Sequence, residues 1–584
     1  MKKDATKSHP QGIRYHIVAC LFLLFAAGLF RLPFVSTLPR GLNWDEVAYG
    51  YNAYSLLKTG KDEWGRPWPL FIKSFGEYKP ALFSYLLIPA LLTFHDWNFA
   101  LRFVPAVLGT LSVVASYGVF FQLTKSAKFS FLAALMMAIM PWHIHYSRAA
   151  MDPIVSYPFF IFGLWLWMKN SWKLRILAAL SLIISMYTYN TERLFVPLLL
   201  LLHGWLFIKP QWKELSRKSL IPFALMAVGT VAIFWETLFG VGGVRARSVT
   251  IFNSQELAQK FYDQTARQVK YHVPIIHFLD SKNYFFAMNY LLRYFSHFRP
   301  DFLFFEGGNL SSQHGFMHYG NLLLIMLPFF VVGVVVGIRQ LSAIQKFFFG
   351  WIVLSPLASA ITIDTPHAGR TLVMVPAMCY FVALGIYSTL QWNGWKKRSM
   401  WKKAFAAFIF GLFLLNIYLY VRDYYLFFPE ESYRAWQGYY TELSAYVGQN
   451  SNTYNKIYLS DYYDNPMIFY EWYNRIDPQL VQNAKRDVYA VDSFGKFAVY
   501  HRNSPLKWCP FAEPNSLVVV DPSLASNFST APQKTFYFYD RFATDTQQSF
   551  LAYSSSNLIL KDKITARQNC DLEKRMATAS ATLR

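Results

Sequence analysis

The run YHIVACLFLLFAAGLF, from Tyr15 to Phe30, decides the class of the protein, because it is apolar over nearly the length of a membrane helix. Four basic residues precede it within the first 14 positions, as they would in a signal peptide. Only a weak cleavage signal follows, and many further apolar runs come later in the chain. The sequence therefore predicts an uncleaved first membrane helix of a polytopic α-helical membrane protein.

Composition supports this class. Of the 584 residues, 54% are hydrophobic, 19% aromatic and 15% charged, which is typical of a membrane protein and excludes a soluble enzyme. The formal net charge is +22, but the excess Lys and Arg lie in short loops between apolar runs, so we predict no nucleic-acid partner. Cys20 and Cys379 lie in apolar segments, which leaves Cys509 and Cys570 as the candidates for a disulfide.

Basic patches set the topology. The patches at residues 125–128, 169–175, 209–218, 339–346 and 396–403 should face the cytoplasm. Alternation then predicts about eleven transmembrane helices, with the N-terminus cytoplasmic and the C-terminus exoplasmic. After the first helix they cover residues 99–123, 129–146, 153–168, 176–190, 194–208, 219–239, 321–338, 347–361, 371–390 and 404–421.

One apolar stretch, residues 80–94, is left out of this count. It has about 15 residues, whereas a spanning helix needs roughly 20. Counting it as a span would also place Lys125 and Lys128 outside. We therefore predict an interfacial or re-entrant helix there.

The topology divides the chain into two parts. Residues 1–421 form the transmembrane module, with exoplasmic loops at 35–98 and 240–320, and residues 422–584 form an exoplasmic soluble α/β domain. Strand-like runs at 456–459, 497–501, 516–521 and 534–539, with a helix-like stretch at 433–447, indicate this domain.

Carboxylates gather on the predicted exoplasmic face. Asp45 and Glu46 follow the first helix in Asn43-Trp44-Asp45-Glu46, and Asp152 precedes Pro153 at the start of a later span. Holding acids at a membrane boundary is costly, which indicates an active site. The alternatives are structural: Asp45 and Glu46 as helix-capping acids, and Asp152 as an N-cap with Pro153 at the first helical position.

Cationic side chains are predicted at the same exoplasmic membrane boundary as these carboxylates. Lys79 lies in Gly76-Glu77-Tyr78-Lys79-Pro80, and the turn from Thr365 to Arg370 supplies His367 and Arg370; Arg148 and Arg193 complete the set. A guanidinium chelates phosphate oxygens in a bidentate fork. The alternatives are that Lys79 snorkels from the interfacial helix and that the turn anchors the next span.

Such a site suits a polyprenyl-phosphate sugar. An acid would deprotonate an incoming hydroxyl, and the cations would steady the leaving phosphate. A divalent cation held by Asp45 and Asp152 is a further possibility left open, because lysine and arginine neutralise phosphate without one. No other cofactor is predicted.

The motifs of residues 43–193 resemble a known family. These are the Asp-Glu pair, the Glu-Tyr-Lys-Pro element, PWHIHYSR before Asp152 and YTYNTER at residues 187–193. They are similar to those of the protein O-mannosyltransferase and aminoarabinose transferase group of integral-membrane glycosyltransferases, which have the GT-C fold. Beyond this segment the resemblance rests on the turn that carries His367 and Arg370.

The resemblance implies roles for individual residues. It implies that Asp45 is the catalytic base with Glu46 beside it, that Asp152 orients the acceptor or an ion, and that Lys79 holds the donor phosphate. The residues expected to line the substrate are Tyr78, His145, Tyr187 and Asn190 from these motifs, with Glu306 and His314 from the large loop. For His145 an interfacial or core position is the alternative.

The predicted function is therefore an inverting glycosyltransferase, acting in the cell envelope at a membrane such as the bacterial plasma membrane. It would move a hexosyl or pentosyl group from a polyprenyl-phosphate donor to an exoplasmic hydroxyl acceptor on a protein, lipid or glycan. The alternative is a transporter or flippase of a lipid-linked sugar. That class fits less well, because transporters place ionisable groups near the bilayer midplane and often contain repeats, which this sequence lacks.

Overall fold

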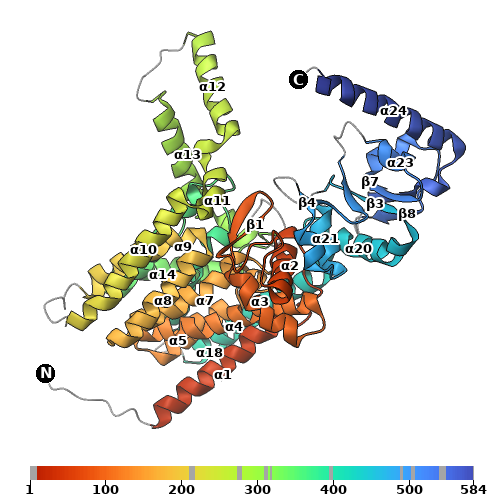
Figure 1. The fold of residues 1–584 in the computed structure, drawn as a ribbon. Helices are drawn as coiled ribbons and strands as arrows, with labels where there is room; N and C mark the ends of the chain where they lie inside the picture. The colour runs from red at the N-terminus through yellow and green to blue at the C-terminus, as the bar shows by residue number, and fades with distance from the viewer. Residues whose placement is uncertain are drawn as a thin grey trace. The chain divides into compact units, whose positions relative to one another are not determined.

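The computed structural model describes residues 10–208, 217–272, 279–307, 313–315, 319–392, 399–463, 465–486, 491–501, 507–537 and 547–582. The chain packs into two compact units (Figure 1). The first contains Met1–Ser36 and Asn98–Leu426, and the second contains Thr37–Trp97 and Phe427–Arg584. Each unit has its own fold.

This division differs from the predicted one in the place of the first exoplasmic loop. We assigned residues 35–98 to the transmembrane module, but they pack with the C-terminal domain. Helix α2 (Trp44–Thr59) lies against α21 (Pro466–Tyr473). Gly50 permits this contact, because a Cβ there would come within 2.6 Å of the Trp472 ring. Such a contact between distant segments leaves no periodic signal in the sequence.

The first unit is helical. Its longer helices are α1 (Pro10–Arg31), α4 (Trp97–Thr124), α5 (Ala127–Ala138), α7 (Asp152–Trp167), α8 (Trp172–Thr188), α9 (Asn190–His203), α10 (Ile221–Phe239), α12 (Gln255–Lys270), α13 (Lys282–Ser296), α14 (Met326–Gln340), α15 (Ala343–Leu354), α17 (Val375–Leu390) and α18 (Ser399–Leu426). Shorter helices are α6 (Pro141–Ser147), η1 (Gly204–Ile208), η3 (Arg217–Leu220), η4 (Val241–Gly243), α11 (Val244–Ser248), η5 (Ile251–Asn253), η6 (Asp301–Phe305), α16 (Leu357–Ala360) and η7 (Gly369–Met374).

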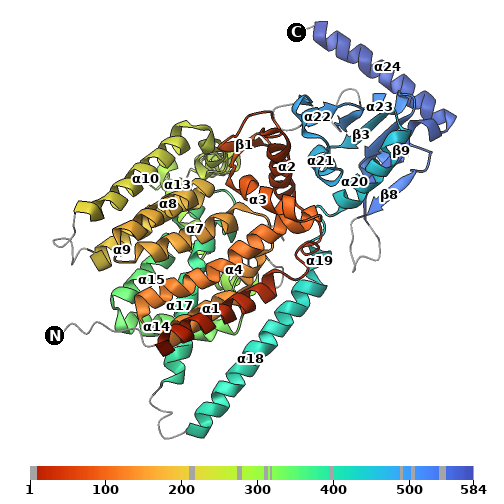
Figure 2. The same ribbon diagram turned by 60° about the horizontal axis from the view of Figure 1, so that its bottom comes forward.

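The helices confirm an integral multi-pass membrane protein. Among the described residues, seven are long and apolar enough to cross a bilayer, or eight if the bent pair α5 and α6 forms one span. Each predicted span coincides with helical structure, while the total of eleven stays a prediction. Helix α17 is largely buried within the unit, whereas α18 is mostly exposed and stands at the edge of the bundle in Figure 2.

The span predicted at residues 129–146 is broken in the structure. It consists of α5 and α6, which are bent by 59° relative to each other. Pro141 begins α6, and a proline cannot donate the backbone hydrogen bond that would continue α5. The bend brings α6 against the segment after η6, where Trp142 N–H donates to the Asn321 carbonyl at 3.0 Å.

Close glycine contacts hold α14 against α17. A Cβ on Gly333 would lie 1.8 Å from the Phe381 carbonyl oxygen, and one on Gly385 would lie 1.8 Å from that of Phe329. Only glycine allows this approach of two backbones, which is a common way to pack membrane helices. Substituting either glycine by a larger residue would force the helices apart.

The second unit combines a hairpin with a larger sheet. Strands β1 (Phe71–Ser74) and β2 (Glu77–Pro80) form an antiparallel pair, and α3 (Leu82–Thr93) follows at the position of the predicted interfacial helix. The seven-stranded sheet has the order β4-β5-β6-β3-β7-β9-β8, in which β3 is parallel to β6 and β7 and the other pairs are antiparallel. Its strands are β3 (Lys456–Ser460), β4 (Lys485–Arg486), β5 (Val491–Phe494), β6 (Phe497–Tyr500), β7 (Ser516–Val520), β8 (Lys534–Tyr537) and β9 (Gln548–Ser554).

The α/β class of this domain is confirmed, with changes in detail. Its helices are α19 (Phe428–Glu431), α20 (Tyr439–Asn450), α21, α22 (Pro478–Gln482), α23 (Cys509–Ala512) and α24 (Leu560–Thr582). The predicted strands coincide with β3, β6, β7 and β8, but β4, β5 and β9 were missed. The predicted helix at 433–447 begins later, at Tyr439, and part of the predicted strand at 534–539 lies outside the described residues.

A disulfide joins Cys509 and Cys570, as the cysteine positions predicted. It links α23 to α24 across 61 residues. We expect its loss in the Cys509→Ser and Cys570→Ser double variant to destabilise this domain by about 2–4 kcal/mol, because the crosslink restricts the unfolded chain. Limited proteolysis of the full-length protein should then release α24 faster than in the wild type. Equal cleavage rates would contradict the prediction.

Candidate functional site

Asp45 and Lys79 form an ion pair in the second unit. Asp45 lies in the first turn of α2, and Lys79 lies in β2, paired with Ile72 of β1. The Lys79 side chain is only 3% exposed and lies over the rings of Tyr49 and Phe75, at 5.5 and 5.1 Å from their centres. The Asp45 side chain is 29% exposed. A partly exposed carboxylate is thus paired with a buried ammonium group that is surrounded by aromatic rings.

Glu46 has a different role in the same turn. Asn43 is the N-cap of α2, and its side-chain oxygen accepts from the backbone N–H groups of Asp45 and Glu46 at 2.7 and 3.2 Å. The Glu46 carboxylate accepts from Asn43 N–H at 3.0 Å, which completes a capping box. The geometry therefore favours the capping alternative for Glu46 and leaves Asp45 as the acid that faces a cation.

Asp152 is not an N-cap. The N-cap of α7 is Met151, and Asp152 is the first helical residue, with Pro153 second. The structural alternative proposed from the sequence is therefore wrong by one position. A carboxylate in a first helical turn is favoured by the helix dipole, whichever further role it has.

Four predicted residues meet in the first unit. His367 lies against His314, with 4.3 Å between the ring centres, and its Nδ1 accepts from the Arg370 backbone N–H at 3.3 Å. His314 Nδ1 lies 3.3 Å from the Tyr146 hydroxyl, and His145 Nε2 lies 2.9 Å from the Gln313 carbonyl oxygen. Gly369 permits η7 to pack closely against α6, because a Cβ at this position would lie 2.8 Å from the Tyr146 hydroxyl oxygen.

Arg370 is largely occupied within its own turn. Its Nη1 donates to the Thr362 hydroxyl at 2.5 Å and to the Asp364 carbonyl at 3.0 Å, and its side chain is 13% exposed. This network fixes the turn that also carries His367. The histidine cluster is therefore a preorganised group of donors and acceptors rather than a set of mobile side chains.

Arg148 is fully buried and holds the end of α1. Its Nη1 donates to the carbonyls of Phe30 and Arg31 and to the Tyr425 hydroxyl, at 3.1 to 3.3 Å. Its guanidinium also lies over the Tyr424 and Tyr425 rings. Cations at a helix C-terminus stabilise its unpaired carbonyls, so the geometry gives Arg148 a structural role.

Arg193 is a second buried arginine that joins helices through hydrogen bonds. Its Nε donates to the Met186 carbonyl at 3.2 Å, and its Nη1 donates to the Thr237 hydroxyl at 2.8 Å. These contacts join α9 to the ends of α8 and α10. Neighbouring Glu192, which the sequence analysis did not single out, is also buried and accepts from Ser156 and Ser185.

The remaining predicted residues lie apart from these groups. Tyr78 lies in β2 under the Arg66 guanidinium, at 5.2 Å from the ring centre. Tyr187 lies at the end of α8 and Asn190 begins α9, both half-buried, while Glu306 is exposed after η6. Among the described residues, no group of three or more His, Cys, Asp or Glu could hold a metal ion. The divalent cation predicted for Asp45 and Asp152 therefore stays a prediction.

Sequence reasoning missed a buried acid pair in the second unit. Glu63 is 6% exposed and Glu471 is fully buried, and neither Glu471 oxygen has a hydrogen-bond partner among the described residues. Burial raises the pKa of Glu63 to about 7, partly offset by Arg486, and burial raises that of Glu471 well above its ordinary value. The polar context of Glu63, in Lys61-Asp62-Glu63-Trp64, gave no sign of burial.

These acids make the stability of the second unit pH-dependent. The pKa of Glu63 in the folded protein exceeds its ordinary value of 4.5. The stability that Glu63 contributes is therefore fully present below about pH 4.5 and is lost as the pH rises through about 7. We expect unfolding of the wild type at a lower temperature at pH 8 than at pH 5. Glu63→Gln should remove part of this difference, roughly 1–3 kcal/mol. Glu77→Gln is the matched control, and an unchanged pH dependence in Glu63→Gln would contradict the prediction.

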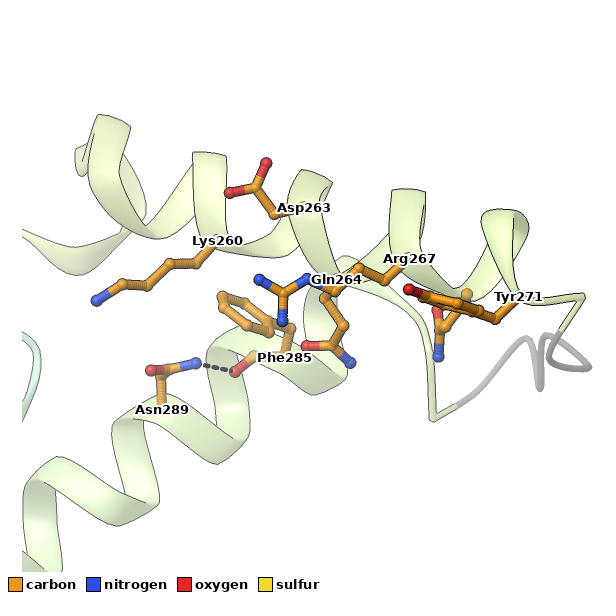
Figure 3. Close-up of a pocket in the computed structure, with 8 residues that line it drawn as sticks. Lys260, Asp263, Gln264, Arg267, Tyr271, Phe285 and Asn289 are labelled. Carbon is orange, nitrogen blue, oxygen red and sulfur yellow. Dashed lines mark hydrogen bonds between the residues drawn. The ribbon is translucent and has the colours of Figure 1, made fainter.

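A cleft of about 520 Å³ lies between α12 and α13 (Figure 3). Its lining is mixed in charge and consists of Lys260, Asp263, Gln264, Arg267, Gln268, Tyr271, Phe285 and Asn289. None of these residues was predicted for the site. A smaller cavity, lined by His145, Tyr146 and His314 among others, coincides with the histidine cluster.

Comparison with solved structures identifies the fold of the protein. No protein-family profile matches the sequence, and no curated protein sequence matches it. ArnT from Cupriavidus metallidurans in the apo state is similar in structure, with a TM-score of 0.50 and 13% identity over 94% of this chain and 98% of that chain. This likeness confirms the predicted GT-C fold.

Two further solved structures are similar at lower scores. ArnT bound to undecaprenyl phosphate has a TM-score of 0.49 and 13% identity over 92% of this chain and 97% of that chain. The archaeal oligosaccharyltransferase AglB from Archaeoglobus fulgidus, in complex with an inhibitory peptide and a dolichol-phosphate, has a TM-score of 0.48 and 11% identity. That match covers 88% of this chain and 70% of AglB.

Proposed function

We propose that the protein is an inverting glycosyltransferase that moves a sugar from a polyprenyl-phosphate donor to an exoplasmic hydroxyl acceptor. The observation that carries this proposal is the ion pair of Asp45 and Lys79. It joins a partly exposed base to a buried cation that suits a phosphate. The GT-C fold and the motifs of residues 43–193 support the same assignment.

The proposed reaction uses both members of the pair. The Asp45 carboxylate takes the proton of the acceptor hydroxyl, and the hydroxyl oxygen attacks the anomeric carbon opposite the phosphate. The bond between that carbon and the phosphate oxygen breaks, and the phosphate leaves with the electron pair. Lys79 stabilises the charge that develops on it.

Most of the other predicted residues lie in the first unit and stay candidates for binding substrate. His367 and Arg370 suit the donor phosphate or its sugar, and His145 and His314 in the same cluster suit polar groups of substrate. Asp152 stays a candidate for orienting the acceptor.

The product of the reaction distinguishes a glycosyltransferase from a transporter of lipid-linked sugar. In proteoliposomes with a labelled polyprenyl-phosphate sugar, a transferase produces free polyprenyl phosphate and a labelled acceptor. A transporter moves intact donor between the leaflets. Free polyprenyl phosphate formed in step with product supports the proposal, and movement of intact donor without cleavage would overturn it.

The disulfide supports an exoplasmic place for the second unit. Disulfides form in oxidising compartments, and Cys509–Cys570 lies in the unit that also contains Thr37–Trp97. We infer a cytoplasmic N-terminus for α1 and exoplasmic positions for both segments of this unit.

A reporter fused after Asn98 tests this topology. We expect an exoplasmic signal, because α3 with 12 residues is too short to cross a bilayer. A fusion after Lys128 is the control and should report a cytoplasmic position. A cytoplasmic signal at Asn98 would make α3 a span and overturn the assignment.

A further inference from the structure

Helix α13 exposes an apolar stripe. Met288, Leu291, Leu292 and Phe295 are 37%, 44%, 66% and 61% exposed. Their spacing of three, four and seven residues puts them on one face of the helix. A helix face in water ordinarily carries polar side chains, so this continuous apolar face indicates a partner.

The N-terminal half of α13 is covered by α12 and η5. Phe285 packs on Phe261 of α12, and Phe286 packs on Phe252 of η5, with ring centres 5.5 and 5.7 Å apart. Figure 1 shows α12 and α13 as neighbouring helices, and Figure 3 shows Phe285 beside the cleft between them. Met288 borders this contact, because it lines a cavity with Phe261 and Gln264 of α12, whereas Leu291, Leu292 and Phe295 are exposed beyond it.

The C-terminal half of α13 runs beside the end of an apolar span. The Tyr294 hydroxyl donates to the Val353 carbonyl at 2.8 Å, and the Tyr290 hydroxyl donates to the Leu357 carbonyl at 3.3 Å. The C-terminal half of α13 is therefore antiparallel to the candidate span Ala343–Ala360.

A second row of contacts confirms this direction. Arg293 Nη1 donates to the Thr362 carbonyl at 3.1 Å, and His297 Nε2 lies 2.8 Å from the Ser359 hydroxyl. Following α13 toward its C-terminus therefore leads back along the span. Val353 lies seven residues before Ala360, about 10 Å below the end of the span at 1.5 Å per residue.

We propose that the C-terminal half of α13 lies in the interfacial zone of the bilayer, with Leu291, Leu292 and Phe295 against lipid acyl chains. The occupant is lipid because the stripe is continuous with a surface that faces the membrane: Val353, which α13 contacts, is itself 52% exposed on an apolar span. Interfacial helices bury an apolar face about 5–10 Å into the acyl boundary, which agrees with the level of Tyr294.

The geometry also sets an order of depth. Because α13 runs down along the span, Phe295 should lie deeper than Leu292, and Leu292 deeper than Met288. The far end, with Lys282 and Asn283 exposed, should stay in water. A docking surface for another protein would give no gradient of membrane depth from Met288 to Phe295.

Lipid-borne quenching measures this order. The full-length protein, with Cys20 and Cys379 replaced by alanine, receives a bimane label at Met288→Cys, Leu292→Cys or Phe295→Cys in nanodiscs that hold one copy. Gln259→Cys, exposed on α12, is the matched control. The quenchers are lipids brominated at defined acyl positions, with iodide as the quencher from water.

The expected result is acyl quenching that increases severalfold from position 288 to position 295, with iodide effective only at Gln259→Cys. Strong iodide quenching at all four positions would overturn the proposal. Shielding of Leu292→Cys only in discs that hold two copies would assign the stripe to a dimer contact and overturn it as well. These outcomes are independent of whether the protein transfers sugar.

Discussion

Replacing Asp45 by asparagine is expected to lower the rate of sugar transfer by about 10²–10⁴-fold, the usual contribution of a general base. Asparagine has the shape of aspartate but cannot accept the acceptor proton. The Asn43 capping box does not use the Asp45 side chain, so α2 should still form. The loss should therefore appear in kcat, with expression and donor affinity near those of the wild type.

Two variants control for this experiment. Glu77→Gln removes a nearby carboxylate from the hairpin that carries Lys79 and should keep most of the activity. Glu46→Gln keeps an acceptor for the capping bond and should affect stability more than chemistry. Turnover by Asp45→Asn within a few fold of the wild type would remove Asp45 from the role of base.

Lys79→Ala is expected to weaken donor binding by about 10–100-fold. A hydrogen bond to a charged group contributes about 1.5–3 kcal/mol, and each 1.4 kcal/mol is a factor of ten in affinity. Because the Lys79 side chain is only 3% exposed, solvent screens its charge little. Titration with a non-transferable polyprenyl phosphate measures the effect without requiring turnover.

Lys73→Ala is the matched control for this variant. Lys73 lies on the partner strand β1, where its ammonium group lies 3.8 Å from the centre of the Trp64 ring. It should bind the donor as the wild type does. Equal affinities for Lys79→Ala and Lys73→Ala would show that the charge of Lys79 does not hold the phosphate.

The membrane class and much of the site could be predicted from sequence because their signals are local. Apolar length and basic loops located the spans, and apolar strand-like runs located β3, β6 and β7. Topology placed Asp45 and Lys79 on one face, and the ion pair agrees with that although 34 residues separate them. The capping box of Asn43 and Glu46 also has a readable signal in its three-residue spacing.

Other features depend on contacts that sequence patterns do not carry. The packing of α2 on α21 joins segments more than 400 residues apart, so the first loop was assigned to the wrong part of the fold. Arg148 was predicted to bind phosphate because it is a cation near a span end. The structure shows it donating to the carbonyls of α1, and phosphate binding by Arg148 stays a prediction. Burial of Glu63 and Glu471 likewise follows from tertiary packing alone.

The measurement that tests the central claim most directly uses purified protein in nanodiscs with a panel of radiolabelled polyprenyl-phosphate sugars. It compares the wild type with Asp45→Asn for release of sugar to an envelope acceptor extract or to water. The account predicts release from one donor by the wild type and its loss in Asp45→Asn. Retained donor binding without release from any member of the panel would contradict glycosyl transfer and favour a transporter of lipid-linked sugar.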